Sequence, residues 1–241
     1  MYFDKQQRTV VKLNKIDCKG WTNMTPNKEN FIKAIYELGG DEHVISNKKL
    51  VNALSISAAS VTEMNARLLK KNIISHVPYR GVKLTPSGIR IAHQLIRKHR
   101  IWEVFLSEKL GYDWNEVHAD ADLLEHVSSD LLIERLNDFL DRPEFDPHGG
   151  VIPNKDGSLP ETSAFPLTDV KTGEQFKIRE VDDDEDFLNY LLDKNIQLGD
   201  RYTLKAVEPY DGPLTLAGAE GREIIIGFKA AHKILVDHIG Q

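Results

Sequence analysis

Residues 46–71, SNKKLVNALSISAASVTEMNARLLKK, decide the fold of the first third of the chain. Ser46 has the residue type of a helix N-cap, and the apolar spacing after it predicts a short amphipathic helix. After a turn at residues 55–57, a second apolar stripe predicts a helix over residues 58–71. The two stripes consist of Leu50, Val51 and Leu54, and of Val61, Met64, Leu68 and Leu69. Two short helices joined by a tight turn predict a helix-turn-helix.

The neighbouring segments complete this predicted unit. The dipeptide Thr25-Pro26 has the residue types of an N-cap and a first helical position, and Gly39-Gly40 would end the helix that begins there. On the other side, residues 73–77 and 82–84 flank a turn with a basic and aromatic tip. This pattern predicts a two-stranded hairpin, so we expect a winged helix-turn-helix.

Farther along, the sequence changes from helical to strand periodicity. Thr85-Pro86 opens a long helix that is expected to run to about Leu110, and two further helices are predicted over residues 118–126 and 129–140. Residues 143–161, rich in Pro, Gly and Asp, are typical of a linker. Short strands then follow at Gln175–Val181, Arg201–Val207 and residues 223–228, with one helix near residues 186–194. We expect a chain that is mainly α, with a small β-barrel of the SH3 type.

Composition and charge narrow the class of protein. The 241 residues are 41% hydrophobic and 28% charged, and Cys18 is the one cysteine, which excludes an internal disulfide and a zinc cluster built from thiolates. With neither an apolar run of roughly 20 residues nor a secretory leader, we expect a cytoplasmic protein without a membrane span. Residues 24–100 carry 13 Lys and Arg against 5 Asp and Glu, a net charge of +8, whereas residues 101–241 carry −17. The basic part favours a polyanion partner and a solvated helix surface about equally.

Possible metal ligands gather in the predicted helix over residues 118–126. Asp122, Glu125 and His126 share one face, while His118 lies a turn earlier. His118 and His126 are about 12 Å apart along the helix, too far for one ion, so the spacing predicts two neighbouring sites. The upstream helix adds His99 and Glu103 at a four-residue spacing. Each pair alone is compatible with a hydrogen bond or a surface ion pair, but the accumulation of Glu and His on adjoining helices favours divalent metal.

The predicted recognition helix carries candidate DNA contacts. Ser57, Ser60 and Thr62 are small hydroxylated residues near its N-terminus, where phosphates and base edges come within reach. Basic residues that could meet backbone phosphate are Arg67, Lys70, Lys71 and Arg80. Any single one of them is equally compatible with ordinary helix surface.

These residues resemble a known family, the diphtheria-toxin-repressor type of metal-dependent transcriptional regulators, and within it the manganese-responsive, three-domain branch. The resemblance runs from Met24 to the C-terminus. Its most specific motifs are Arg97-Lys98-His99-Arg100 with Glu103, then Val117-His118 with Glu125-His126-Val127, and Asp146-Pro147-His148-Gly149-Gly150. The resemblance implies the following division: an unassigned N-terminal extension (1–23), a winged-helix DNA-binding domain (24–86), a helical metal-binding and dimerisation domain (87–142), a linker carrying metal ligands (143–161) and an SH3-like domain (162–241).

The resemblance also implies two metal sites. The primary site would consist of Asn30, Asp122, Glu125, His126, Asp146 and His148, and the secondary site of His99, Glu103, His118, Asp183 and Asp186. Family contacts of the recognition helix would fall on Ser57, Ala59, Ser60 and Thr62. The branch usually has Asp at the position of Asn30, and relatives often have Cys at those of Asp122 and Asp146. Carboxylates in place of sulfur favour Mn(II).

The implied function is a Mn(II)-dependent repressor of manganese uptake and homeostasis genes, a homodimer that binds double-stranded operator DNA. An Fe(II)-dependent repressor of the same fold is the nearest alternative, because Fe(II) accepts the same donors. Another alternative is a winged-helix regulator that senses an organic ligand. A dimetal hydrolase or oxidase is the alternative from a different class. Enzyme activity is not expected, because the sequence contains no Gly-rich phosphate loop, nucleophile elbow or His-Glu-x-x-His motif.

Overall fold

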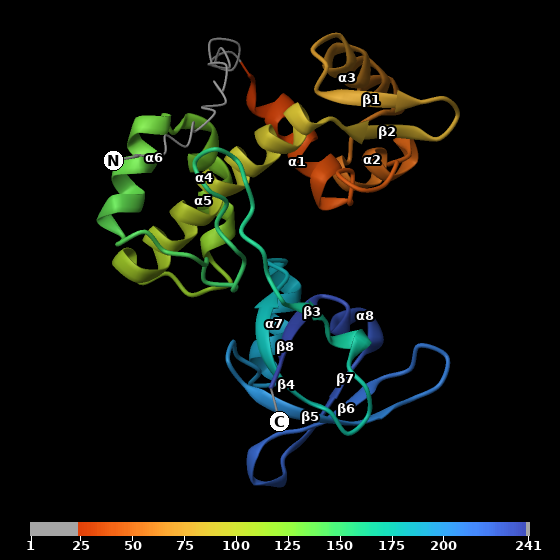
Figure 1. The fold of residues 1–241 in the computed structure, drawn as a ribbon, viewed down its shortest axis with the longest axis vertical. Coiled ribbons are helices and arrows are strands. Elements are labelled where there is room, and N and C mark those ends of the chain that lie inside the picture. The colour runs from red at the N-terminus through yellow and green to blue at the C-terminus, as the bar shows by residue number, and fades with distance from the viewer. Residues whose placement is uncertain (1–23, 240–241) are drawn as a thin grey trace, which may run out of the picture.

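A winged helix-turn-helix forms the first part of the computed structural model, which describes residues 24–239 (Figure 1). Its elements are α1 (Pro26–Glu37), α2 (Asn47–Leu54), α3 (Ala58–Lys70), β1 (Ile74–Val77) and β2 (Gly81–Leu84). The hydroxyls of Ser46 and Ser57 cap α2 and α3 by accepting hydrogen bonds from Lys49 N and Ser60 N. β1 and β2 pair antiparallel as the predicted wing. The predicted extension over residues 1–23, including Cys18, lies outside the described residues.

One long helix, α4 (Pro86–Leu110), belongs to two hydrophobic cores. Ile91 and Ala92, in its first half, are buried with the core of the winged helix. Ile101 and Val104, in its second half, are buried in a separate core with the next helices. A movement of α4 is therefore felt in both parts of the molecule. Every helix within residues 24–239 is too short or too polar to cross a membrane.

The second core consists of two adjoining clusters, one between α4 and α5 (Val117–Val127) and one between α4 and α6 (Asp130–Phe139), with Trp102 packed against both. Ser129 caps α6 with its hydroxyl, and Gly111 ends α4 in the left-handed conformation, at a φ of 75°. The outer surface of these helices is unusually apolar. Its exposed large side chains are Leu110, Leu123, Val127, Leu131, Leu132 and Phe139. Such a surface is suited to burial against a second copy of the chain.

The expected linker contains residues that are buried rather than solvated. Asp146, His148, Val151 and Ile152 are each at most 8% exposed, and an isolated bridge pairs Phe145 with Val151. Because α4 extends through two cores and this segment is buried between others, the division at residues 24–86, 87–142, 143–161 and 162–241 stays a prediction.

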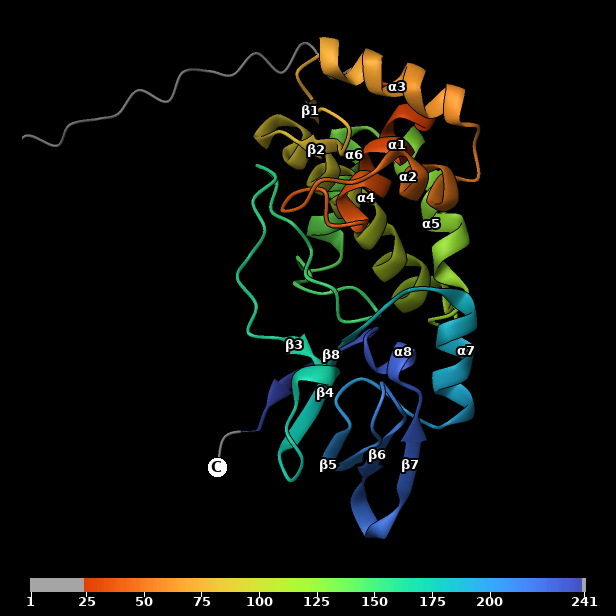
Figure 2. The ribbon, with the colours of Figure 1, turned by 90° about the vertical axis from the view of Figure 1, so that its right-hand side faces the viewer.

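An antiparallel sheet forms the C-terminal part, at the opposite end of the molecule from α3 (Figure 2). Its strand order is β3-β8-β4-β5-β6-β7, with β3 (Phe165–Pro166), β4 (Gln175–Val181), β5 (Arg201–Val207), β6 (Leu214–Ala217), β7 (Glu223–Ile226) and β8 (Ile234–His238). The helix α7 (Glu185–Asp193) follows β4, and α8 (Phe228–Ala231) follows β7. The predicted strands are present as β4, β5 and β7, and the sheet has the expected SH3-like character. The strands β3, β6 and β8 were not among those named from the sequence.

Candidate metal centre

Most of the predicted ligands face one cavity of about 770 Å³ between the three parts of the molecule. Helices α4 and α5 supply donors from one side, the segment after α6 supplies Asp146 and His148, and the loop between β4 and α7 supplies Asp183. Three groups have ligand atoms within 4.8 Å of one another: His99, Glu103, His118 and Asp183; Glu103, Asp146 and His148; and His99, Asp122 and Glu125. The first two groups share Glu103, and we call Glu103, His118, Asp146, His148 and Asp183 the Glu103 cluster.

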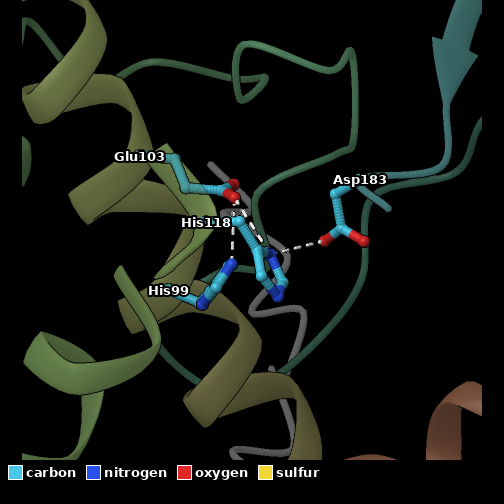
Figure 3. Close-up of side chains that lie close together, drawn as sticks. All are labelled: His99, Glu103, His118 and Asp183. Carbon is cyan, nitrogen blue, oxygen red and sulfur yellow. Dashed lines mark hydrogen bonds and ion pairs between the residues drawn. The ribbon is translucent and has the colours of Figure 1, made fainter. Parts of the chain in front are cut away.

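Glu103 lies at the centre of its cluster, with a side chain that is 1% exposed (Figure 3). Its Oε1 is 3.7 Å from His118 Nδ1 and 3.7 Å from His148 Nδ1. The same nitrogen of His118, Nδ1, is 3.3 Å from Asp183 Oδ2. Ligands that share an ion at about 2.1 Å lie roughly 3 to 3.5 Å apart, so these spacings are close to those of a coordination shell.

Both imidazoles present an acceptor nitrogen to Glu103. His148 Nε2 is 2.6 Å from the carbonyl oxygen of Trp114, to which it can only donate, so Nδ1 is left without a proton in the neutral ring. His118 Nε2 lies 3.3 Å from Asp122 Oδ2, which fixes this ring in the same way. His118 Nδ1 is buried and has no hydrogen-bond partner within residues 24–239. An acceptor nitrogen facing two carboxylates fits a bound cation.

Asp146 shapes the loop that carries His148. Its Oδ1 accepts hydrogen bonds from the backbone N–H groups of His148, at 2.8 Å, and Gly150, at 2.9 Å. Its Oδ2 is 3.0 Å from Arg100 Nε. A Cβ on Gly150 would collide with Asp146 and Arg100, and Gly149 has a φ of +86°, which favours glycine. The Pro-His-Gly-Gly motif thus places the His148 ring against Glu103.

The carboxylates and imidazoles of the Glu103 cluster shift one another's pKa values. Burial would raise the pKa of Glu103, but the neighbouring His118, His148 and His99 hold it well below its usual range. The nearby carboxylates of Asp122, Asp183 and Glu103 raise the pKa of His118 to about 12. Glu103 is therefore a buried anion that is stable only beside positive charge. Protons on the neighbouring histidines or a bound divalent ion can supply that charge. The donor set, carboxylate and imidazole, fits such an ion.

The third group contains a cation from the chain itself. Lys33, on α1, places Nζ 2.9 Å from Asp122 Oδ1, 3.2 Å from Glu125 Oε2 and 3.3 Å from His99 Nδ1. We call Lys33, His99, Asp122 and Glu125 the Lys33 cluster. Although burial alone would lower the pKa of Lys33, the charges of Glu125 and Asp122 raise it. The ammonium of Lys33 already occupies the space between these two carboxylates, so the group does not fit a divalent ion as well.

Four of the five residues predicted for the secondary site, His99, Glu103, His118 and Asp183, lie together, and the assignment of ligands to two sites stays a prediction. The arrangement differs from the predicted grouping in three respects. Asp146 and His148 group with Glu103 rather than with Asp122 and Glu125, because the Pro-His-Gly-Gly loop passes beside Trp114 and Arg100. Asn30 is exposed at the cavity, and α1 turns Lys33 toward the carboxylates instead. Asp186 is exposed in the first turn of α7 and is in none of the groups formed by residues 24–239.

His126 faces α1 as well. Its Nδ1 is 2.6 Å from Glu29 Oε2, and its Nε2 is 3.4 Å from Glu125 Oε1. No role at the site was predicted for Glu29, Lys33 or Arg100. A signal for Lys33 was present: it is three residues after Asn30, so a helix face that presents one to the bundle also presents the other.

The candidate DNA contacts lie on the outer side of the winged helix. Ser57, Ala59, Ser60, Thr62, Arg67 and Arg80 are all exposed. The Ser57 hydroxyl already accepts from Ser60 N, the Thr62 hydroxyl donates to the carbonyl of Ala58, and Arg67 pairs with Glu63. These local bonds leave the side chains accessible on α3, and their role in DNA binding stays a prediction.

Fold and site together define a class, a winged-helix DNA-binding protein with a cation centre in its helical bundle. Three family models match consecutive parts of the chain: the N-terminal DNA binding domain of iron dependent repressors over residues 23–82, their metal binding and dimerisation domain over 85–154, and the FeoA domain over 165–238.

Individual proteins agree with these matches. The diphtheria toxin repressor of Corynebacterium diphtheriae is 27% identical over 231 residues, covering 90% of this chain and 99% of that protein. The structure of the manganese regulator SloR is 34% identical with a TM-score of 0.78, covering 90% of this chain and 100% of that one. ScaR with bound Zn²⁺ is 36% identical with a TM-score of 0.81, covering 89% and 100%.

The chain belongs to the iron-dependent repressor family, the diphtheria-toxin-repressor type of metal-dependent transcriptional repressors. The predicted resemblance and the predicted fold class are confirmed. Operator DNA and a second copy of the chain are its partners, in keeping with the DNA-binding and dimerisation domains that match.

Proposed function

We propose that this repressor responds to Mn(II) and controls manganese uptake and homeostasis genes from the cytoplasm. The observation that carries the proposal is the donor set of the Glu103 cluster, which consists of carboxylate oxygens and imidazole nitrogens. Hard donors of this kind favour Mn(II) over softer metal ions, which prefer thiolate ligands. The names of the structural relatives include a manganese regulator, SloR, which supports the same ion.

The cluster joins segments that must keep a fixed arrangement for DNA binding. A bound ion would supply positive charge that Glu103 and His118 in the bundle, His148 after α6 and Asp183 beside the C-terminal sheet share. Glu103 is on α4, whose first half is buried in the winged-helix core. Fixing α4 therefore restricts the orientation of the winged helix-turn-helix of each protomer, which we call the reading head. In a dimer, two heads must meet half-sites about one helical turn of DNA apart, so a narrower range of orientations raises DNA affinity.

Fluorescence anisotropy of the full-length, chelator-treated protein on DNA from upstream of a metal-transporter operon tests the proposal. At fixed salt, Mn²⁺ is expected to raise DNA affinity strongly and Zn²⁺ to do so less. By linkage, the same DNA tightens Mn²⁺ binding by an equal factor. Binding that is independent of metal would overturn the proposal and favour a regulator that senses an organic ligand.

Fe(II) is the second candidate, because it accepts the same donors and the family models are those of iron dependent repressors. An anaerobic Fe²⁺ titration in the same assay distinguishes the two ions. If Fe²⁺ gives the greater gain in DNA affinity at equal free concentration, the Fe(II) alternative replaces the Mn(II) proposal. We infer no enzyme activity, since the family consists of repressors, and metal-dependent turnover of a hydrolase or oxidase substrate would contradict this inference.

A further inference from the structure

Lys33 occupies the centre of a group in which the sequence predicted metal ligands. Its ammonium contacts Asp122 Oδ1 at 2.9 Å, Glu125 Oε2 at 3.2 Å and His99 Nδ1 at 3.3 Å. We propose that Lys33 is a built-in cation that takes the place of a second metal ion, docks α1 on the bundle without metal, and leaves one metal site per protomer. The count of one rests on the proposed function of the Glu103 cluster, whereas the docking by Lys33 does not.

The contacts of Lys33 are those of an anchored group rather than of a surface lysine. Its side chain is 11% exposed and that of Glu125 is 0% exposed. An ammonium has three protons to donate, and the carboxylate oxygens of Asp122 and Glu125 lie within reach of two of them. A lysine seldom gives up water to this extent unless a partner is present, and here two carboxylates from another part of the fold are the partners.

The contacts join different parts of the molecule. Lys33 is on α1, in the winged helix, while Asp122 and Glu125 are on α5, in the bundle. The bond between Glu29 Oε2 and His126 Nδ1, 2.6 Å long, adds a second link from α1 to α5. These side-chain contacts hold α1 against α5 without metal, in addition to the continuous helix α4. The metal-dependent part of the switch is therefore assigned to the Glu103 cluster.

A divalent ion and the ammonium cannot use these oxygens together. An ion bound to Asp122 Oδ1 and Glu125 Oε2 at about 2.1 to 2.3 Å would overlap the position of Nζ, and its charge would repel the ammonium. Glu125 Oε1 and His126 Nε2, 3.4 Å apart, are the buried acceptors that remain beside it. Two ligands are too few for Mn²⁺, which prefers six-coordinate oxygen-rich sites.

The first test counts Mn²⁺ per protomer in the full-length protein by elemental analysis after gel filtration at saturating Mn²⁺. The wild-type protein is expected to hold one ion, and Lys33→Glu two, because this change removes the cation and adds a carboxylate. Lys28→Glu, on the first turn of the same helix, is the matched control and is expected to hold one. Two ions in the wild-type protein, with the second lost in Asp122→Asn, would overturn the proposal, as would one ion in a folded Lys33→Glu protein.

The second test needs no variant and no metal. Reductive methylation of the chelator-treated wild-type protein, followed by peptide mass spectrometry, is expected to modify Lys33 at least about 10-fold more slowly than the exposed Lys48 and Lys49. Equal rates would overturn the docking role of Lys33. A wild-type protein that binds no Mn²⁺ while Lys33 stays protected would overturn the proposed function and the count of one ion, but not the docking.

Discussion

The Glu103 cluster and the Lys33 cluster are neighbours that meet the same need for positive charge in different ways. His99 joins them, with Nε2 2.9 Å from Glu103 Oε1 and Nδ1 2.8 Å from Glu125 Oε2. In the first cluster, imidazole acceptors and carboxylates surround a position that an ion would fit. In the second, an ammonium from α1 fills the position. Carboxylates gathered on a helix face, such as Asp122 and Glu125 on α5, therefore do not define a metal site until the side chain opposite them is known.

The largest expected effect comes from removing the charge at the centre of the Glu103 cluster. Glu103→Gln is expected to weaken Mn²⁺ binding by about 100-fold or more, since the shared carboxylate of both donor groups is lost. DNA affinity at limiting Mn²⁺ should fall in parallel. Isothermal titration calorimetry and fluorescence anisotropy measure the two effects. Glu108→Gln, an exposed residue five positions later on α4, is the control, and an equal loss in that variant would contradict the assignment.

A smaller effect is expected where the C-terminal part contributes a ligand. Asp183→Asn should weaken Mn²⁺ binding by roughly 10-fold, because Asp183 is half-exposed and contacts only one face of His118. Asp186→Asn should leave the affinity unchanged, since that side chain is exposed and outside the cluster. The same titrations test both variants. If Asp186→Asn proves to be the damaging change, the loop must rearrange when metal binds.

The pH dependence of stability should show whether protons on His99 and His118 balance the charge of Glu103 when no metal is bound. The pKa of His99 is raised to about 10 and that of His118 to about 12, against an ordinary value of 6.5, so the native metal-free protein binds more protons than the unfolded chain. Their contribution is complete below pH 6.5 and is lost as pH rises toward those values, so stability should fall from pH 7 to 9. Urea unfolding at both pH values measures this change.

Two variations of this experiment sharpen it. His118→Asn should reduce the slope of stability against pH by about one proton. In the presence of Mn²⁺, apparent metal affinity should instead rise with pH, because His118 must lose its proton to serve as a ligand. A metal-free protein whose stability rises between pH 7 and 9 would contradict the charge balance described for the cluster.

The smallest effect concerns the Lys33 cluster. A double-mutant cycle with Lys33→Met and Asp122→Asn should give a coupling energy of about 1 kcal/mol in metal-free protein, because Asp122 is half-exposed and its ion pair is partly screened. Urea unfolding of the four proteins measures the coupling. A coupling of zero would mean that the contact between Lys33 and Asp122 does not help to hold α1 on the bundle.

Much of the fold could be predicted from periodicity and capping residues. Ser46, Ser57 and Ser129 begin α2, α3 and α6 as helix signals indicate, and the long α4 follows from Thr85-Pro86. The strands β6 and β8 could not be predicted in the same way. They are four and five residues long, and their pairing with β5 and with β4 depends on contacts distant in sequence.

Ligand residue types could be predicted, but their grouping could not. Helix spacing separated His118 from His126, and the structure keeps them in different surroundings, beside Asp183 and beside Glu29. The side of the bundle that His148 faces depends on a loop that Trp114 and Arg100 hold in place. The spacing of neighbouring residues does not predict such contacts, because they join segments distant in sequence. Lys33 was missed because a lysine is an expected surface residue on an amphipathic helix, and its burial depends on α5.

Anomalous X-ray diffraction from crystals of the full-length protein grown with Mn²⁺ would show how many ions each protomer binds and which residues hold them. Data collected on both sides of the manganese absorption edge locate each ion without reference to the protein geometry. We expect one peak per protomer, between Glu103, His118, His148 and Asp183, with Lys33 still bonded to Asp122 and Glu125. A peak among His99, Asp122 and Glu125, with the Lys33 side chain withdrawn, would contradict it.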